Sequence, residues 1–257
     1  MKIAVCAKVV PEQARRIDPE TKRLDRSGDP ALNPFDAHAV EEALRLKGDD
    51  ADGEVVIVSF GPERSLDALR KALAMGADRV VLVSDEAAAG SDLVASSHAL
   101  AQALDREEAD LVLFGQQAND SDGAVMGAAV ADRLRRPLIS QVAELTISDG
   151  SVRGKRQTEF GYDAIEAPLP AIVAVSDAIN EPRYPSLKGI MGAKKKPQDT
   201  PSVGDLGLDA ARVGEAGSKT EVYAINEPPP RGETQKIEDD GSAAEKVVAF
   251  LLERKAL

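Results

Sequence analysis

Hydrophobic residues along the chain fall into short continuous runs that alternate with longer segments of helical period. The runs are rich in Val, Ile and Leu, and strands are expected at 2–10, 54–61, 79–85, 110–115 and 171–176. Amphipathic helices are expected at 37–47, 63–75 and 91–104, where apolar residues recur every three or four positions. Because the strand runs are apolar throughout, both of their faces are expected to be covered, and the alternation predicts an α/β fold with a mostly parallel sheet.

The pattern changes near residue 145. Polar and apolar residues alternate there around Asp149-Gly150, which predicts a hairpin arm at 142–153 and hence an antiparallel extension of the sheet. From 197 onward the chain is rich in Gly, Pro, Ser and Asp, which predicts a loop or tail outside the core. A strongly amphipathic helix is expected at 243–257, and it needs a surface on the α/β domain or on a partner chain. The predicted organisation is a domain at 1–196 and an extended C-terminal arm at 197–257.

Charge and composition narrow the class of protein. The 257 residues carry a net charge of −12, which argues against a nucleic-acid-binding surface over the whole protein. With a single cysteine there is no disulfide framework, so a cytoplasmic location is the simplest interpretation. No apolar stretch approaches the ~20 residues of a membrane helix, so no membrane insertion is expected.

The loops that follow the strands are the candidate ligand sites, because parallel sheets bind ligands beyond their carboxyl ends. After the fourth strand comes Gly115-Gln-Gln-Ala-Asn-Asp-Ser-Asp-Gly-Ala-Val-Met126, in which Ser121 or Asp122 could cap the next helix. This loop could cradle a phosphate, but without a Walker lysine or a GxGxxG the spacing alone favours an ordinary capped loop. Asn33 could bind an adenine edge or ribose, and Asp36 could cap a helix. Phe60 could belong to the core or to an adenine slot.

Catalytic and metal chemistry find little support in the sequence. His38 and His98 lie on predicted helices without companion ligands at metal-binding spacing, so no metal site is expected. Cys6 lies in a strand, where an inert, small apolar role is the ordinary one. Asp120 and Asp122 are close together, but helix capping accounts for them. No nucleophile, base and orienting group belong together, so no catalytic residue is predicted.

The segment 182–196, PRYPSLKGIMGAKKK, places apolar residues among prolines, glycines and a lysine run. Pro182, Pro185 and Gly189 predict an irregular, projecting loop. Its Leu, Ile and Met side chains could pack back against the domain or remain exposed to solvent.

A set of motifs, in order from residue 1 to about 196, resembles the beta subunit of electron-transfer flavoprotein. They read AVCAKVVP, NPFDAHAVEEALRLK, VSFGPE, LRKALAMGADRVVLV, DLVLFGQQANDSDG, LPAIVAV and NEPRYPSLKGIMGAKKK. The resemblance implies a Rossmann-like, adenine-nucleotide-hydrolase-like domain in a heterodimer with an alpha subunit. It implies an electron carrier rather than an enzyme, which takes electrons from flavin-containing dehydrogenases and passes them to a quinone reductase or another acceptor.

The resemblance also implies the cofactors and their residues. FAD would be shared with, and mainly held by, the alpha subunit, while the beta subunit would bury an AMP, or a second FAD in its place. A neutral cradle of backbone amides and the Ser121 hydroxyl would hold the AMP phosphate. The AMP pocket would be lined by Cys6, Asn33, Pro34, Phe35, Asp36, Phe60, Gly115, Gln116, Gln117, Ala118, Asn119, Asp120, Ser121, Asp122, Gly123, Ala124, Val125 and Met126. The loop 182–196 would bind partner dehydrogenases through Tyr184, Leu187, Ile190, Met191, Lys194, Lys195 and Lys196, with Leu187 as the apolar anchor. The arm would dock on the alpha subunit.

Five positions depart from the family pattern, and two of them, Cys6 and Phe60, lie in the implied pocket. Gln157 follows Arg156 where a carboxylate is common, and it lacks the charge for an ion pair with the alpha subunit. Lys188 and Gly192 replace a Pro and a Lys, which indicates a different choice of partner. Two alternatives remain: a flavin-bifurcating beta subunit that binds FAD and NADH, and a stand-alone ATP-binding module of the stress-protein type.

Overall fold

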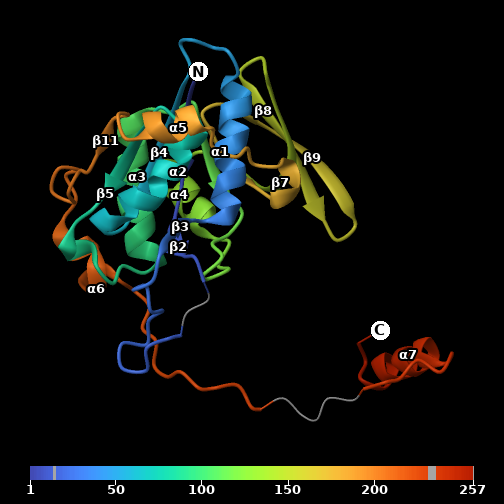
Figure 1. Ribbon diagram of the computed structural model, residues 1–257. Coiled ribbons are helices and arrows are strands. Elements are labelled where there is room, and N and C mark those ends of the chain that lie inside the picture. Colours follow the sequence, from blue (N-terminus) through green and yellow to red (C-terminus); the bar gives the residue numbers. More distant parts are fainter. Residues whose placement is uncertain (14–15, 231–235, 257) are drawn as a thin grey trace. The chain divides into compact units, whose positions relative to one another are not determined.

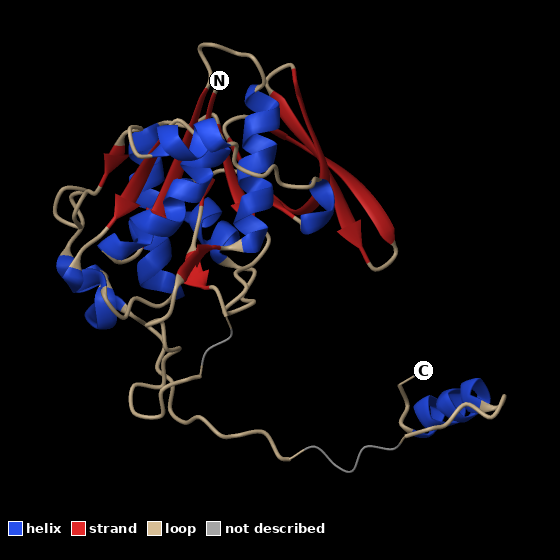
Figure 2. Ribbon diagram, viewed as in Figure 1, coloured by secondary structure: helices blue, strands red, loops and turns tan. Residues whose placement is uncertain are grey.

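The computed structural model describes residues 1–13, 16–230 and 236–256. The chain divides into a large unit, Met1–Val222, and a small unit, Tyr223–Leu257, which are described separately (Figure 1). The predicted α/β class is confirmed for the large unit, in which helices cover a mostly parallel sheet (Figure 2).

A nine-stranded sheet forms the centre of the large unit, in the order β11-β5-β4-β1-β6-β10-β7-β8-β9. The parallel strands are β1 (Lys2–Cys6), β4 (Glu54–Phe60), β5 (Arg79–Val83), β6 (Leu111–Gly115), β10 (Ala171–Val175), β11 (Gln198–Asp199) and the first part of β7 (Leu138–Ser148). From β1 the chain builds outward through β4 and β5, then returns to the other side of β1 with β6. The topological switch point, where open parallel sheets bind their ligands, therefore lies between β1 and β6.

Helices on both faces of the sheet enclose two hydrophobic cores. One face carries α1 (Pro34–Lys47), α2 (Leu66–Met75) and α5 (Leu187–Ala193), and the other carries α3 (Leu93–Glu107) and α4 (Met126–Leu134) (Figure 1). Val55 and Ile57 are buried in the first core, while Val56 and Val58 are buried in the second. Successive side chains of a strand point to opposite faces, so both sets must be apolar, and this is the origin of the continuous apolar runs.

Short elements complete the large unit. They are β2 (Val9–Pro11), β3 (Pro30–Leu32), α6 (Gly214–Gly217) and the 3-10 turns η1 (Glu63–Ser65), η2 (Glu86–Ala88), η3 (Asp177–Ile179) and η4 (Ala210–Arg212). The strand predicted at 2–10 is thus two strands, because the chain leaves the sheet after Cys6 and β2 pairs antiparallel with β3.

The predicted antiparallel extension is confirmed. Strand β7 continues into β8 (Ser151–Thr158), and β9 (Gly161–Pro168) follows antiparallel to it. Asp149 and Gly150 both have positive φ, of 50° and 75°, as a two-residue type I′ turn requires. Gln157, the departure from the family pattern, lies in β8 opposite Tyr162.

The domain boundary predicted at 196 is wrong, because the large unit extends to Val222. Strand β11 adds to the sheet beside β5, and Val203, Leu206, Leu208 and Val213 are buried in the second core. Their Gly- and Asp-rich surroundings resemble a tail in composition, but irregular backbone can still bury apolar side chains.

The small unit contains α7 (Ala243–Glu253), within the helix predicted at 243–257. No residue of α7 is buried, and Val247, Val248, Phe250 and Leu252 are exposed. Residues 231–235 and Leu257, also part of the predicted arm, lie outside the described residues.

The segment 182–196 is not the irregular loop predicted from its prolines and glycines, because Leu187–Ala193 form α5. The Ser186 hydroxyl accepts the Gly189 amide at 3.0 Å, as an N-cap does. A Cβ on Gly189 would lie 2.3 Å from the Ala74 carbonyl oxygen. Gly189 therefore serves to bring α5 close to α2, rather than to keep the segment irregular.

Candidate functional site

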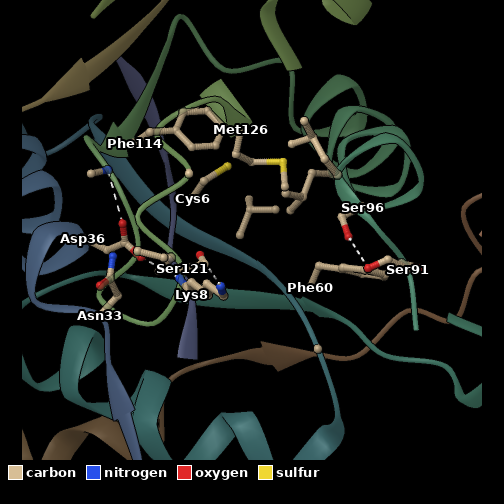
Figure 3. Close-up of a pocket in the computed structure, with 18 of the residues that line it drawn as sticks. Cys6, Lys8, Asn33, Asp36, Phe60, Ser91, Ser96, Phe114, Ser121 and Met126 are labelled. Carbon is tan, nitrogen blue, oxygen red and sulfur yellow. Dashed lines mark hydrogen bonds between the residues drawn. The ribbon is translucent and has the colours of Figure 1, made fainter. Parts of the chain in front are cut away.

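A cavity of about 1130 Å³ lies beyond the carboxyl ends of β1, β4, β5 and β6, at the switch point of the sheet. Figure 3 shows the side chains that line it. Ligand sites commonly enclose ~300–1,000 Å³, so the cavity has room for a ligand of nucleotide size or larger.

Most of the predicted pocket residues do line this cavity. They are Cys6, Asn33, Asp36, Phe60, Gly115, Gln116, Gln117, Ala118, Ser121, Gly123, Ala124, Val125 and Met126. Five predicted residues do not line it, namely Pro34, Phe35, Asn119, Asp120 and Asp122. Pro34 is exposed, whereas the Asp120 carboxylate is covered by the cations that bind it. The sequence therefore identifies the loop after β6 as part of the cavity lining, but not every predicted residue faces the cavity.

Asn33 lies at the N-cap position of α1, and its side chain holds the loop that follows β6. Its Nδ2 donates to the Gln117 carbonyl at 2.8 Å, and its Oδ1 accepts the Asn119 amide at 3.0 Å. Both polar atoms of the amide are thus already bonded, and the residue is 1% exposed. The suggestion that Asn33 binds an adenine edge is therefore replaced by a role in shaping the loop.

Asp36 is not the helix cap predicted from the sequence, because α1 begins two residues before it and Asn33 holds the cap position. Its carboxylate instead accepts the Lys8 amide at 2.7 Å and the Gly115 amide at 3.2 Å. These bonds tie the chain after β1 to the end of β6, on either side of the switch point. Burial raises the pKa of Asp36 to about 7, against the opposing effect of these hydrogen bonds.

Cys6 forms part of the apolar wall of the cavity. It is 5% exposed, and burial raises the pKa of its thiol well above the usual value, with a further contribution from the Asp36 charge. The side chain is thus a neutral thiol, in agreement with the inert role predicted for it. Val58, Phe60, Leu100, Phe114 and Met126 add to the apolar lining, which suits a planar ring. Figure 3 shows Phe60, Phe114 and Met126 among these side chains.

Two cations that the predicted neutral cradle did not include lie at the cavity. Lys8 and Arg26 both line the space, and both bind the carboxylate of Asp120. The Lys8 Nζ lies 2.7 Å from Asp120 Oδ1 and 3.4 Å from Ser121 Oγ. Sequence reasoning missed them because Lys8 follows a strand of apolar residues and Arg26 lies in the long connection between β2 and β3.

The N-terminus of α4 opens onto the same cavity. The prediction that Ser121 or Asp122 caps this helix is wrong. The helix begins only at Met126, and Val125 is at the cap position. Within the described structure the amides of Met126, Gly127 and Ala128 have no protein acceptor. Since Val125, Met126 and Gly127 line the space, these amides offer hydrogen bonds and a positive helix end to an anion.

A second loop, Ser84–Leu93, lines the far side of the cavity and was not predicted. It follows β5 and contributes Ser84, Asp85, Gly90, Ser91 and Asp92. The rule that ligands bind beyond the carboxyl ends of strands applied to this loop as well as to the loop after β6. The Ser, Asp and Gly residues of this loop are the feature of the sequence that could have indicated a ligand site there.

The histidines show no metal-binding arrangement. His38 contacts the Asn180 carbonyl oxygen through Nδ1 at 3.0 Å, and His98 lies on α3. Among the described residues, no three His, Cys, Asp or Glu side chains are grouped so as to hold a metal ion. None of the described helices combines the length and hydropathy needed to cross a bilayer.

The predicted partner-binding residues form an exposed surface on and beside α5. Tyr184 is 93% exposed, Leu187 76%, Met191 70% and Ile190 53%. Lys194 and Lys195 are exposed as well. Lys196 differs, because its Nζ donates to the carbonyls of Leu73 at 3.0 Å and Ala77 at 2.5 Å, at the C-terminal end of α2. It therefore anchors the segment and is not part of the displayed surface.

Comparison with known proteins identifies the family of this chain. Residues 21–206 match the electron transfer flavoprotein domain. The chain is 35% identical to the electron transfer flavoprotein subunit beta of Mycobacterium tuberculosis, with 99% of each chain covered. It is 38% identical to that of Megasphaera elsdenii, with 97% of this chain and 98% of the relative covered. Identity is also 38% to the caffeyl-CoA reductase-Etf complex subunit CarD of Acetobacterium woodii, over 99% and 97% of the two chains. The chain therefore belongs to the electron transfer flavoprotein family, as a beta subunit.

Proposed function

We propose that the chain forms a heterodimer with an electron transfer flavoprotein alpha subunit and binds AMP in the cavity beyond β1 and β6. FAD would be held mainly by the alpha subunit, with this chain completing its site. Flavin-containing dehydrogenases would donate electrons, and a quinone reductase or another acceptor would receive them. The flavin supplies the redox chemistry when bound, while the residues of this chain bind, position and dock. A cytoplasmic location fits the single, buried cysteine.

The single observation that carries the proposal is the composition of the cavity. Its apolar walls, Val58, Phe60, Leu100, Phe114 and Met126, provide the slot that an adenine ring needs. Its polar lining includes the Ser121 hydroxyl and the uncapped amides of α4, and a nucleotide phosphate would supply an acceptor for them. The cavity thus offers an apolar wall and an anion site in one space, the two features that a nucleoside phosphate joins.

Co-expression with an alpha subunit tests the proposal. A stable heterodimer that carries FAD is expected, and the nucleotide released from it by acid should be identified by mass spectrometry as AMP. FAD at two molecules per heterodimer would instead support the bifurcating alternative. A chain that purifies alone and binds ATP tightly would support the stand-alone module and overturn the proposal.

The exposed surface on α5 predicts a kinetic effect of one substitution. Leu187→Ala is expected to slow electron transfer from a partner dehydrogenase about tenfold, since truncating a central apolar anchor costs about 1–2 kcal/mol of binding. Leu187 is 76% exposed, so the free energy of unfolding and the flavin content should not change. Stopped-flow measurement of flavin reduction against dehydrogenase concentration gives the rate.

Ile17→Ala is the matched control, because Ile17 is also exposed, at 50%, but lies outside both the α5 surface and the C-terminal arm. It should reduce the rate by less than twofold. Equal rates in the Leu187 variant and the native chain would rule out the anchor role.

A further inference from the structure

We propose that Lys8 and Arg26 make the cavity selective for a phosphorylated nucleotide over the bare nucleoside. The inference rests on the proposed nucleotide site and adds the residues that would recognise the charge of the ligand. It assigns the selection to two side chains rather than to backbone amides alone.

Lys8 and Arg26 share one buried carboxylate. The side chain of Asp120 is 4% exposed, with Lys8 Nζ on its Oδ1 at 2.7 Å and an Arg26 guanidinium nitrogen on its Oδ2. Burial by itself would raise the pKa of Asp120, but hydrogen bonds and charge from Lys8, and then from Arg26, hold it below its usual value. Asp120 is thus ionised and balances one of the two cations, so that Lys8, Arg26 and Asp120 together carry one net positive charge.

The positive charge of Lys8 and Arg26 faces the cavity. The side chains of Lys8 and Arg26 are 40% and 41% exposed, and both residues line the space, whereas Asp120 does not. Figure 3 shows the Lys8 amine and the Ser121 hydroxyl directed toward each other, and the two atoms lie 3.4 Å apart. The uncapped amides of α4, which begins at Met126, open onto the same cavity. Cationic side chains, a hydroxyl and free amides therefore line one space, and these are the donors that a phosphate dianion takes.

Arg26 is held in place for this role. Its carbonyl accepts a hydrogen bond from the Arg64 guanidinium at 2.7 Å, which fixes its backbone beside the loop after β4. The carboxylate of Asp120 then fixes its side chain. A purely structural latch between the two loops would need only one cation on Asp120. The second cation can instead bind an anionic ligand that enters the cavity.

Isothermal titration with AMP and adenosine tests the inference, on the heterodimer with its alpha subunit after removal of bound nucleotide. The native protein should bind AMP more tightly than adenosine. Lys8→Met and Arg26→Met should each weaken AMP binding about tenfold, the size of a charge-assisted hydrogen bond, and leave adenosine binding within twofold. The two variants should also show a weaker dependence of AMP affinity on salt.

The control variant is Arg23→Met, which removes a cation from the same connection but one that pairs with Glu215 and does not line the cavity. It should leave both affinities unchanged. Lys8→Arg and Arg26→Lys keep the charge and should keep the preference for AMP, and they serve where a methionine variant fails to fold.

The outcomes separate the inference from the proposed function. Unchanged AMP affinity in both methionine variants would overturn the selective role while the nucleotide site stands. Equal losses for AMP and adenosine would show that the residues only shape the cavity, and would overturn the inference as well. Failure of the native protein to bind either ligand would remove the proposed nucleotide site itself.

Discussion

Replacement of Gly115 by alanine is expected to lower the free energy of unfolding by about 3 kcal/mol, at the upper end of ordinary overpacking costs. Gly115 ends β6, and a Cβ there would lie 2.5 Å from both Asp36 Oδ1 and the Phe35 carbonyl carbon, and 2.7 Å from the Asp36 amide nitrogen. Two of these three atoms are backbone of α1, so rotation of a side chain cannot relieve the overlap. The helix must move away from the sheet, which breaks the bond between the Gly115 amide and Asp36. Urea unfolding of the two proteins, followed by circular dichroism, gives the difference.

Gly123→Ala is the matched control in the same loop. Nothing lies within 4 Å of a Cβ at Gly123, so the free energy of unfolding should stay within about 0.5 kcal/mol of the native value. If the two alanine variants unfold at the same urea concentration, the close approach of α1 to β6 is not what Gly115 serves.

Local pattern was enough to predict the central parallel strands and the helices α1, α2 and α3. Each parallel strand that the apolar runs indicated is present, because burial on both faces leaves few polar residues in a run. The Asp149-Gly150 turn could be predicted equally well, since few dipeptides adopt two positive φ angles. The small strand β11 and the buried residues Val203, Leu206, Leu208 and Val213 were not readable, because they lack the period of a helix or strand.

The site was predicted only where its residues are close together in the sequence. The loop after β6 was found, but the partners that shape it come from far along the chain. Asn33 bonds residues 84 and 86 positions away, and Lys8 reaches Asp120 across 112 positions. A propensity for helix capping explained Asp36 and Ser121 locally, but Asp36 makes long-range contacts instead and α4 begins later than Ser121.

The structure of segment 182–196 also depends on long-range contacts that local composition does not reveal. Prolines and glycines predict irregular backbone when the chain is considered alone. In the fold, Gly189 lets α5 approach α2, and the Arg183 guanidinium binds the carboxylate of Glu41 on α1 at 2.7 Å. Lys196 then closes the C-terminal end of α2. The apolar side chains remain exposed because their helix is fixed to the domain from its other side.

The buried carboxyl of Asp36 is expected to make the protein less stable as pH rises from about 4 to about 7. Its pKa is 3.8 when unperturbed and about 7 in the folded chain. Between these values the unfolded chain releases the proton while the folded chain retains it, so the folded state binds more protons. The free energy of unfolding then falls by about 1.4 kcal/mol per pH unit from this group, or about 4 kcal/mol in all. The stabilisation is fully present below pH 4 and lost above pH 7.

Other carboxyls act in the opposite direction, since the pKa values of Glu107 and Asp120 are lowered in the folded chain. Asp36 is therefore isolated by the difference between the native chain and Asp36→Asn, each unfolded with urea at several pH values from 4.5 to 7.5. An amide cannot accept both the Lys8 and Gly115 amides, so the variant loses a constant amount of stability. The difference between the proteins should nevertheless shift by about 3 kcal/mol across this range, in favour of the variant at high pH. A curve for Asp36→Asn that runs parallel to the native one would mean that Asp36 is ionised throughout, with its charge satisfied by those two amides.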